Sequence, residues 1–389
     1  MALLASKQCH NPSWPTSQKN SHKRVILLCK RIEYAELNLR ELFAKGSLMT
    51  RSFFIVFLLI IIAGPSLAKD PIMTPPDEPM MGELDACIIE NLYESEDADA
   101  GLPLLLADEG FQSLVEKHDF KLFGGPMVGC LTPNSAKIWV RTLGPAAVSV
   151  SINRRTFNNP IYLTLTPIPV TSEEQDFTAV VDVPFLQPET IYEYNVLVDG
   201  HPVFGEDELP SFCTPPEAGE SYSFDIGFGG GARYNPPKER MWDTVNSFDP
   251  LAFLFLGDNI YIDEPLWRNK QRAMYYRRQM RPEHAQFLAE TGIYSIWDDH
   301  DFGVNDTSGG LDPFDPDWKV PAWRVFMENW NNPGYGGGES LPGCYYKFTL
   351  GDVEFFMTDG RYYRDFDEGA MLGPDQKAWL LESLSASTA

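Results

Sequence analysis

The run Leu251-Ala252-Phe253-Leu254-Phe255-Leu256, followed by Gly257-Asp258-Asn259-Ile260-Tyr261, decides the fold of this chain. The first six residues are all apolar, which is typical of a strand buried on both faces of a sheet. Such strands belong to α/β domains, in which helices cover the sheet and loops at the carboxyl ends of the strands carry the chemistry. Because Asp258 follows this strand directly, the run predicts a carboxylate at the rim of the sheet.

Strands and helices alternate around this run, which indicates an α/β domain over residues 221–389. Short apolar segments predict further strands, and longer segments with helical spacing or with Pro in the first turn predict helices. The expected strands cover 222–228, 293–297, 345–350 and 353–358, and the expected helices cover 266–290, 321–330 and 375–384.

Residues 122–214 contain short segments in which apolar and polar side chains alternate, and they predict a separate β domain. Short alternating strands separated by turns are typical of β-sandwiches, so we expect an immunoglobulin-like (Ig-like) β-sandwich here. Pro215-Pro216 is the expected linker to the α/β domain. The segments that alternate between apolar and polar side chains are 136–141, 147–152 and 191–196.

Phe53–Ala63 is an uninterrupted apolar run of 11 residues. A membrane-spanning helix needs about 20 such residues, whereas the core of a signal peptide needs only about 7–15. Residues 49–68 are therefore predicted to be a signal peptide, and residues 1–48 an upstream extension from a mis-assigned start; the alternative is an uncleaved membrane anchor. Export to the periplasm, the cell surface or the medium follows, and it permits disulfides. The candidate cysteines, for which buried thiols are the alternative, are Cys87, Cys130, Cys213 and Cys344.

The chain is acidic, with 55 Asp and Glu against 31 Lys and Arg and a formal net charge of −24. The predicted leader is basic, so the acid is concentrated in the remainder, and residues 69–121 are expected to be an acidic irregular segment with one short helix at 111–118. An acidic body repels nucleic acid and anionic membrane surfaces. We therefore expect no nucleic-acid partner, and membrane contact only through an uncleaved leader. The composition leaves the oligomeric state open.

A second strand end is more acidic still. Trp297-Asp298-Asp299-His300-Asp301 places three carboxylates and an imidazole within four residues. Without a cation these like charges would repel and raise one another's pKa. Carboxylate oxygens with one imidazole suit Ca, Mg, Mn or Fe, so this segment is a candidate metal site, to which Asn305 and Asp306 close behind could add ligands. The alternative is an acidic loop in which Asp298 caps a helix.

An arginine follows another apolar strand, in the segment Asp359-Gly360-Arg361. A guanidinium at a strand end beside metal ions can hold two phosphate oxygens, so Arg361 is a candidate phosphate ligand. The alternative is a surface ion pair of Asp359 with Arg361 or Arg364. His284, which lies near an arginine-rich helix, is expected at the surface rather than at the site.

Five motifs in the same order resemble the alkaline phosphatase D (PhoD-like) family of metallophosphoesterases. Each motif alone is modest, but five in register are specific, and the resemblance runs from about residue 123 to the C-terminus. The motifs are GPMVG at 125–129 with SAKIWVR at 135–141, LGDNIY at 256–261, IWDDHD at 296–301, DGRYYR at 359–364 and LGPDQ at 372–376.

The resemblance implies an N-terminal Ig-like β-sandwich followed by a four-layer αββα metallophosphoesterase domain, which is incomplete here. It implies that a phosphate ester substrate, a phosphomonoester or phosphodiester, is hydrolysed by metal-activated hydroxide. On this reading Asp258 bridges the metal ions and Tyr261 ligates iron. Asp299 and His300 bind metal or polarise the leaving group, and Arg361 steadies the phosphate. Calcium and iron are the implied metals, with manganese or magnesium as alternatives.

Two departures from the family pattern matter. The family places a metal-binding cysteine after its first catalytic strand, where this chain reads Phe228-Gly229-Gly230-Gly231-Ala232. The family's late Gly-Asp-x-His segment lies beyond a further strand, and this chain ends at Ala389 after the helix expected at 375–384. The chain is therefore expected to be a C-terminally truncated product. The alternative function is that of an exported binding module without catalytic activity.

Overall fold

The computed structural model describes residues 25–28, 79–154, 168–235 and 238–389. The predicted signal peptide lies outside these residues, as do most of the predicted upstream extension and the first ten positions of the acidic segment. Within the described ranges, no helix combines the length and the apolar character that crossing a membrane requires.

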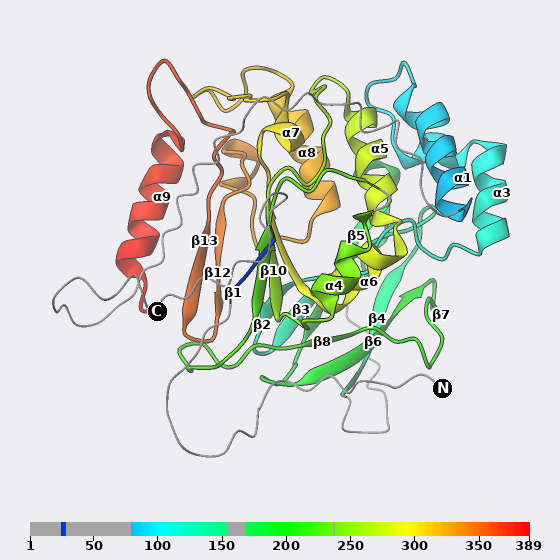
Figure 1. Ribbon diagram of the computed structural model, residues 1–389, viewed down its shortest axis with the longest axis horizontal. Helices are drawn as coiled ribbons and strands as arrows, with labels where there is room; N and C mark the ends of the chain where they lie inside the picture. Colours follow the sequence, from blue (N-terminus) through cyan, green and yellow to red (C-terminus); the bar gives the residue numbers. More distant parts are fainter. Residues whose placement is uncertain (1–24, 29–78, 155–167, 236–237) are drawn as a thin grey trace.

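A mixed sheet of seven strands runs through the centre of the molecule (Figure 1). Its first four strands pair in parallel, and the remaining strands pair antiparallel. A parallel pairing of Ile293 with Gly129 joins the two parts. In spatial order the strands are β1 (Val25–Leu28), β9 (Ile226–Gly229), β10 (Ala252–Leu256), β11 (Gly292–Ile296), β2 (Met127–Thr132), β3 (Ser135–Arg141) and β5 (Thr178–Pro184).

The apolar run that opens the sequence argument forms β10, and its side chains alternate between two cores. Phe253 and Phe255 pack on the helix side of the sheet, and Leu254 and Leu256 face the opposite side. This is the alternation that a pleated strand imposes, and apolar residues in both phases are what a strand covered on both faces requires. The helices on the first side are α4 (Met241–Asn246), α5 (Arg268–Gln279), α6 (Pro282–Glu290) and α8 (Lys319–Asn329).

The other face of the sheet is covered by an antiparallel hairpin of β12 (Tyr346–Leu350) and β13 (Val353–Met357). Phe348 of the hairpin stacks on Tyr294 of β11, with ring centroids 3.6 Å apart. Helix α9 (Gly373–Ala386) lies outside the hairpin, where Trp379 contacts Tyr345 at 4.9 Å between centroids (Figure 1). The order of layers is therefore helices, sheet, hairpin and helix.

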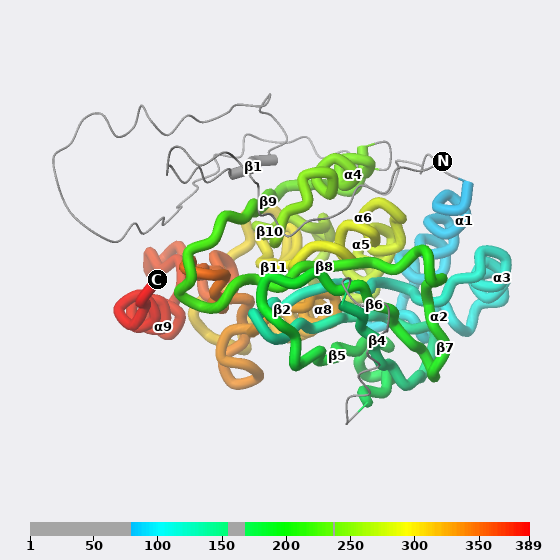
Figure 2. The backbone as a smooth tube through the Cα atoms, turned by 90° about the horizontal axis from the view of Figure 1, so that it is seen from below, coloured from blue at the N-terminus to red at the C-terminus, as the bar shows by residue number. Residues whose placement is uncertain are grey.

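The β region of residues 122–214 shares a sheet with the α/β region. Its strands form two sheets around one apolar cluster, and β2 also continues into the parallel sheet beside β11 (Figure 2). Pro215 and Pro216 are buried, unlike an exposed linker. The sequence analysis missed this pairing because it predicted no strand at β2, and a pairing at one register position has no local signature. The second sheet contains β4 (Val148–Arg154), β6 (Ile191–Val198), β7 (His201–Pro202) and β8 (Ser211–Cys213).

A polar seam joins this β region to the helices of the α/β region. Arg141 is fully buried and donates to Gln279 Oε1 at 2.8 Å and to Asn329 Oδ1 at 3.0 Å. Trp139 Nε1 donates to the carbonyl oxygen of Glu328 at 3.0 Å. Because both ends of the two Arg141 bonds are buried, breaking them would leave polar groups unpaired, which makes the contact specific.

The segment 69–121 contains four helical elements from residue 79 onwards, so the prediction of an irregular segment was wrong for those that precede residue 109. Its high charge hid apolar residues at helical spacing, and Met81, Leu84, Ile88 and Leu92 are all fully buried against α5. The short helix expected at 111–118 is confirmed. The helices are α1 (Pro79–Ile88), the π-helical turn η2 (Ile89–Tyr93), α2 (Leu102–Leu106) and α3 (Glu109–His118).

The single helix expected over 266–290 is two helices, α5 and α6, which meet at Pro282. Proline has no N–H to donate and disfavours helical angles in the residue before it, and Arg281 is accordingly extended at φ −66 and ψ 125. The cysteines Cys87, Cys130 and Cys344 are free thiols, so none of the disulfides allowed among these three is present.

A buried ion pair attaches the N-terminal helices to the body, and we expect Asp85→Ala to destabilise the fold strongly. Arg277 Nη2 lies 2.7 Å from Asp85 Oδ2, and both side chains are at most 4% exposed. Removing one partner leaves a buried charge without compensation, which costs about 3–5 kcal/mol in the free energy of unfolding, as urea denaturation would measure.

The matched control is Glu83→Ala. Glu83 pairs with Lys117 on the surface of the same helix layer, so its loss is expected to cost less than about 1 kcal/mol. Equal, small losses for both variants would contradict the assigned role of the buried pair.

Candidate metal centre

The site begins where β10 and β11 end side by side. Gly257 has φ 98, and a Cβ at this position would lie 2.4 Å from the backbone nitrogen of Asp298. Only glycine therefore allows the two strand ends to approach this closely. Asp258 follows in a left-handed conformation with φ 51, which is uncommon for a residue with a side chain and typical of functional sites.

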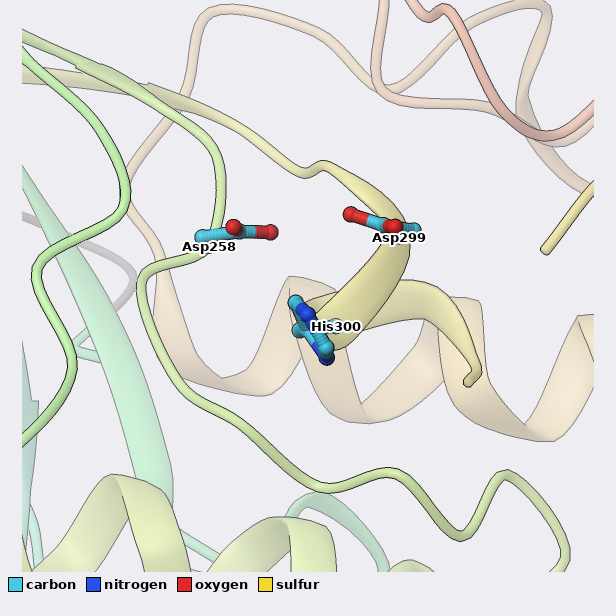
Figure 3. Close-up of side chains that lie close together, drawn as sticks. All are labelled: Asp258, Asp299 and His300. Carbon is cyan, nitrogen blue, oxygen red and sulfur yellow. The ribbon is translucent and has the colours of Figure 1, made fainter. Parts of the chain in front are cut away.

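Three potential ligands meet at this edge. Asp258, Asp299 and His300 each offer a ligand atom, and these atoms all lie within 4.8 Å of one another. Asp258 comes from the loop after β10, whereas Asp299 and His300 come from the short helix α7 (Asp299–Phe302) after β11 (Figure 3). The structure thus brings together the three residues that the sequence predicts as the core of a metal site.

The charges at this edge are not balanced by the protein alone. Burial, and then the negative charges of Asp298 and Asp299, raise the pKa of Asp258 to about 7. Among the described residues, Asp258 Oδ1 is buried and accepts no hydrogen bond. A buried acceptor without a partner is costly, and a cation would satisfy it while removing the repulsion. The donor set therefore fits a hard metal ion.

Asp299 is stabilised as the anion. Burial raises its pKa, but the backbone N–H of Asp306, which donates to Oδ2 at 2.5 Å, and the charge of Arg361 lower it below the ordinary value. The two carboxylates of the cluster therefore differ. Asp299 already has protein donors, whereas Asp258 Oδ1 has none in the described part of the chain.

His300 is oriented by Asp263, a residue that the sequence analysis did not assign to the site. The Nδ1 atom of His300 lies 2.5 Å from Asp263 Oδ1, which leaves Nε2 as the ring nitrogen free to meet a ligand. The backbone N–H of Ile262 donates to the carbonyl oxygen of His300 at 3.2 Å, which ties the loop to the helix. The available signal was an aspartate two residues beyond Tyr261 in a strand-end loop.

Tyr261, for which the family resemblance implies a metal-ligand role, lies beside the cluster. Its hydroxyl donates to Asp258 Oδ2 at 3.1 Å, and its ring packs on His300 with centroids 4.3 Å apart. Arg233, from the segment after β9, lies over the same ring at 5.5 Å from its centroid. Tyr261 is thus held between two side chains and contacts a predicted ligand.

Arg361 reaches the same cluster from the end of β13. Its Nε donates to Asp298 Oδ1, and its Nη2 lies 3.6 Å from Asp299 Oδ1. The surface ion pair with Asp359 is therefore excluded. Asp359 is fully buried and accepts from Trp297 Nε1 at 2.8 Å and from the backbone N–H of Arg361 at 2.9 Å, so it shapes the turn that carries the arginine.

Asn305 does not join the cluster. Its side chain is exposed and donates to Asp306 Oδ2 at 2.8 Å. The capping alternative proved true in part, because Asp298 and Asp301 form a capping box at the start of α7. Asp301 also accepts the backbone N–H groups of Asn259 at 2.8 Å and Ile260 at 3.1 Å, so it holds the loop after β10 in place.

His284 is not a surface residue, contrary to the prediction. It is only 2% exposed and packs edge-on against Trp242, with centroids 4.9 Å apart. Burial lowers the pKa of His284 to about 3, so its ring is neutral. The arginine-rich surroundings that suggested a surface position belong to a helix whose charges are themselves buried, as Arg277 and Arg278 show.

Comparison with known families divides the chain into two matched regions. Residues 227–389 match the family described as PhoD-like phosphatase. Residues 119–217 match a family described as a domain of unknown function, DUF7800. No curated protein matches the chain.

Among solved structures, a structure of PhoD is similar with a TM-score of 0.57 and 17% sequence identity, over 69% of this chain and 61% of that one. This likeness shows a shared mixed α/β fold, and the chain spans 61% of the length of that protein. The sensor domain of the anti-sigma factor RsgI4 in Pseudobacteroides cellulosolvens matches with a TM-score of 0.16 and 18% identity, over 25% of this chain and 91% of its own, which is too low to carry an argument.

Asp258→Asn is expected to stabilise the metal-free protein at alkaline pH. The folded-state pKa of about 7 lies above the ordinary value of 3.8, so ionised Asp258 destabilises the fold increasingly as pH rises between these values. The variant should gain on the order of 1–3 kcal/mol at pH 8.5 in urea denaturation with chelator present, and the gain should shrink towards pH 4. A gain that does not depend on pH would contradict the assigned repulsion.

Asp263→Asn is expected to lower the pKa of His300 in the metal-free protein. Burial lowers this pKa, but the hydrogen bond with Asp263 and the charges of Asp258 and Asp299 raise it above its ordinary value of 6.5. The pair therefore stabilises the fold at acidic pH, and the contribution is lost as pH rises through the raised pKa. An NMR titration of the imidazole measures the shift, and an unchanged pKa would show that Asp263 does not act on the ring.

Proposed function

We propose that this chain carries the site of a metal-dependent phosphoester hydrolase, because residues 227–389 match the family described as PhoD-like phosphatase. The observation that supports it best is the cluster of Asp258, Asp299 and His300, in which a buried carboxylate oxygen has no partner among the described residues. Hydrolysis of phosphomonoesters or phosphodiesters is the reaction class that such a site serves.

In this proposal Asp258, Asp299 and His300 hold the cation, and Tyr261 adjoins it through its hydrogen bond to Asp258. Two carboxylates and one imidazole favour calcium or iron, with manganese or magnesium as alternatives. A bound cation would lower the pKa of a water molecule and offset the charge of phosphoryl oxygens. Asn305 is left out of the ligand set because its side chain is exposed and bonded to Asp306.

Arg361 supplies positive charge next to the carboxylates of Asp298 and Asp299. Its guanidinium contacts Asp298 and Asp299, and the remaining N–H groups are available for phosphoryl oxygens. Asp263 keeps Nε2 of His300 free for the cluster. These residues bind and orient, which is the main contribution of a protein to phosphoryl transfer.

The wider predictions remain part of the proposal. The predicted leader supports export, and the acidic composition disfavours a nucleic-acid partner. The two sheets around one core in residues 127–213 support an Ig-like sandwich that is fused to the α/β region rather than linked to it. The order helices, sheet, hairpin and helix supports a four-layer αββα arrangement.

A second candidate is an exported binding module without catalysis. The cluster in the described part of the chain supplies three ligands, fewer than the about 6–8 oxygen ligands that calcium takes, so the described ligand set is smaller than a full calcium site. A chain that binds a cation but does not turn over substrate would fit this reading. Metal binding and turnover therefore have to be measured separately.

The decisive experiment combines elemental analysis with hydrolysis of an aryl phosphate. We expect the metal-loaded chain to hydrolyse the ester, and Asp258→Asn to lose at least roughly 100-fold in kcat/KM together with the metal. Asp367→Asn, which changes an exposed carboxylate in the loop after β13, is the matched control and should keep both. Metal content without hydrolysis would support the binding module, and absence of metal would contradict both readings.

A further inference from the structure

Lys319 is a buried cation that the proposed reaction does not use. It lies at the start of α8, is fully buried, and its Nζ is 4.3 Å from the centroid of the Tyr362 ring and 5.4 Å from that of Tyr363. The ammonium donates to the carbonyl oxygens of Gly310 at 3.2 Å and Asp312 at 2.6 Å. Lysine is almost never fully buried unless its charge is met, and here ring faces and carbonyl groups meet it.

The two segments that Lys319 contacts are bonded to each other. The backbone N–H of Gly309 donates to the carbonyl oxygen of Arg361 at 2.9 Å, and that of Gly310 donates to Arg364 at 2.9 Å. The Tyr362 hydroxyl donates to the carbonyl oxygen of Pro313 at 2.8 Å. Residues 309–313 and 361–364 therefore form one clamp, with the ammonium at its centre.

The fit of this clamp is tight. A Cβ on Gly309 would lie 2.2 Å from the Tyr362 carbonyl oxygen and 3.0 Å from Lys319 Cε. Burial also lowers the pKa of Lys319 to about 8, so placing the ammonium here has a free-energy cost that its contacts must offset.

Arg361 is the functional residue that the clamp holds. Its backbone lies inside the clamp, and its side chain extends to Asp298, Asp299 and the carbonyl oxygen of Thr307. A displacement of about 1 Å at a group that binds the transition state can cost on the order of 100-fold in rate. The position of the guanidinium therefore depends on the contacts that the clamp makes with the backbone of residues 361–364.

We infer that Lys319 is a positioning residue for Arg361, which it acts on by binding residues 309–313 to the turn that carries the arginine. The inference rests on the proposed function, in which Arg361 binds phosphoryl oxygens. Lys319 touches neither the metal cluster nor the substrate in this arrangement.

The first test does not depend on activity. Hydrogen exchange of Lys319→Met should show the amides of Gly309 and Gly310 exchanging at least roughly 10-fold faster than in the parent chain, while β10 and β11 keep their protection. Lys347→Met, which removes an exposed lysine of the hairpin, is the matched control and should change neither. Unchanged exchange at both glycines would overturn the inference.

The second test asks whether Lys319 acts through Arg361. Lys319→Met should lower kcat/KM for an aryl phosphate by roughly 10- to 100-fold and weaken inhibition by inorganic phosphate, with metal content unchanged. In a double-mutant cycle, the kcat/KM of the Lys319→Met, Arg361→Gln double variant should be no lower than that of Arg361→Gln alone. Fully additive losses would overturn the inference. If the parent chain itself hydrolyses nothing, the proposed function fails, and the exchange result still decides the clamp.

Should Lys319→Met fail to fold, Gly309→Ala perturbs the same clamp from the opposite segment. Its methyl group would meet the Tyr362 carbonyl oxygen, so the loop must shift while Lys319 is retained. Weaker inhibition by phosphate with full metal content is the expected result, and inhibition equal to that of the parent chain would contradict the inference.

Discussion

Asp258 and Asp299 lie within a few ångströms of each other at a buried sheet edge, and the repulsion between them is the constraint around which the site is built. The two carboxylates meet because β10 and β11 are parallel neighbours and because Gly257 lets their ends touch. A backbone N–H and an arginine contact the carboxylate of Asp299, whereas one oxygen of Asp258 has no hydrogen-bond partner among the residues that the structure describes. An arrangement that is costly without a cation is a natural place for one.

Acidic residues of one short segment have separate tasks in this site. Asp299 faces the cluster, Asp298 holds Arg361, and Asp301 accepts backbone N–H groups of the neighbouring loop. Asp359, from another strand end, likewise organises a turn rather than a charge pair. Most of the carboxylates near the cluster are therefore scaffold, which explains how two of them can be held so close together.

The sequence predicted β10 and the residues that follow it better than it predicted how the surrounding segments pack. A run of six apolar residues predicted β10, because the pattern of a buried strand is local, and acidic residues directly after strands pointed to Asp258, Asp299 and His300. The pairing of β2 with β11 was missed, since one shared register position has no local signature. The high charge of residues 69–121 led to the prediction of an irregular segment, although one face of α1 is buried. The arginine-rich surroundings of His284 led to the prediction of a surface position, although its side chain is buried. Asp263 was not assigned to the site, because its contact with His300 depends on a backbone turn that composition does not encode.

The continuous sheet has a consequence for how such chains evolve. The regions 119–217 and 227–389 match two different families, yet β2 of the first pairs with β11 of the second, and Trp139 and Arg141 reach into the helices beyond it. Recombination that replaced either region would have to recreate this seam as well as the fold on each side. The two regions are therefore expected to be inherited together, as one unit of selection rather than as two exchangeable modules.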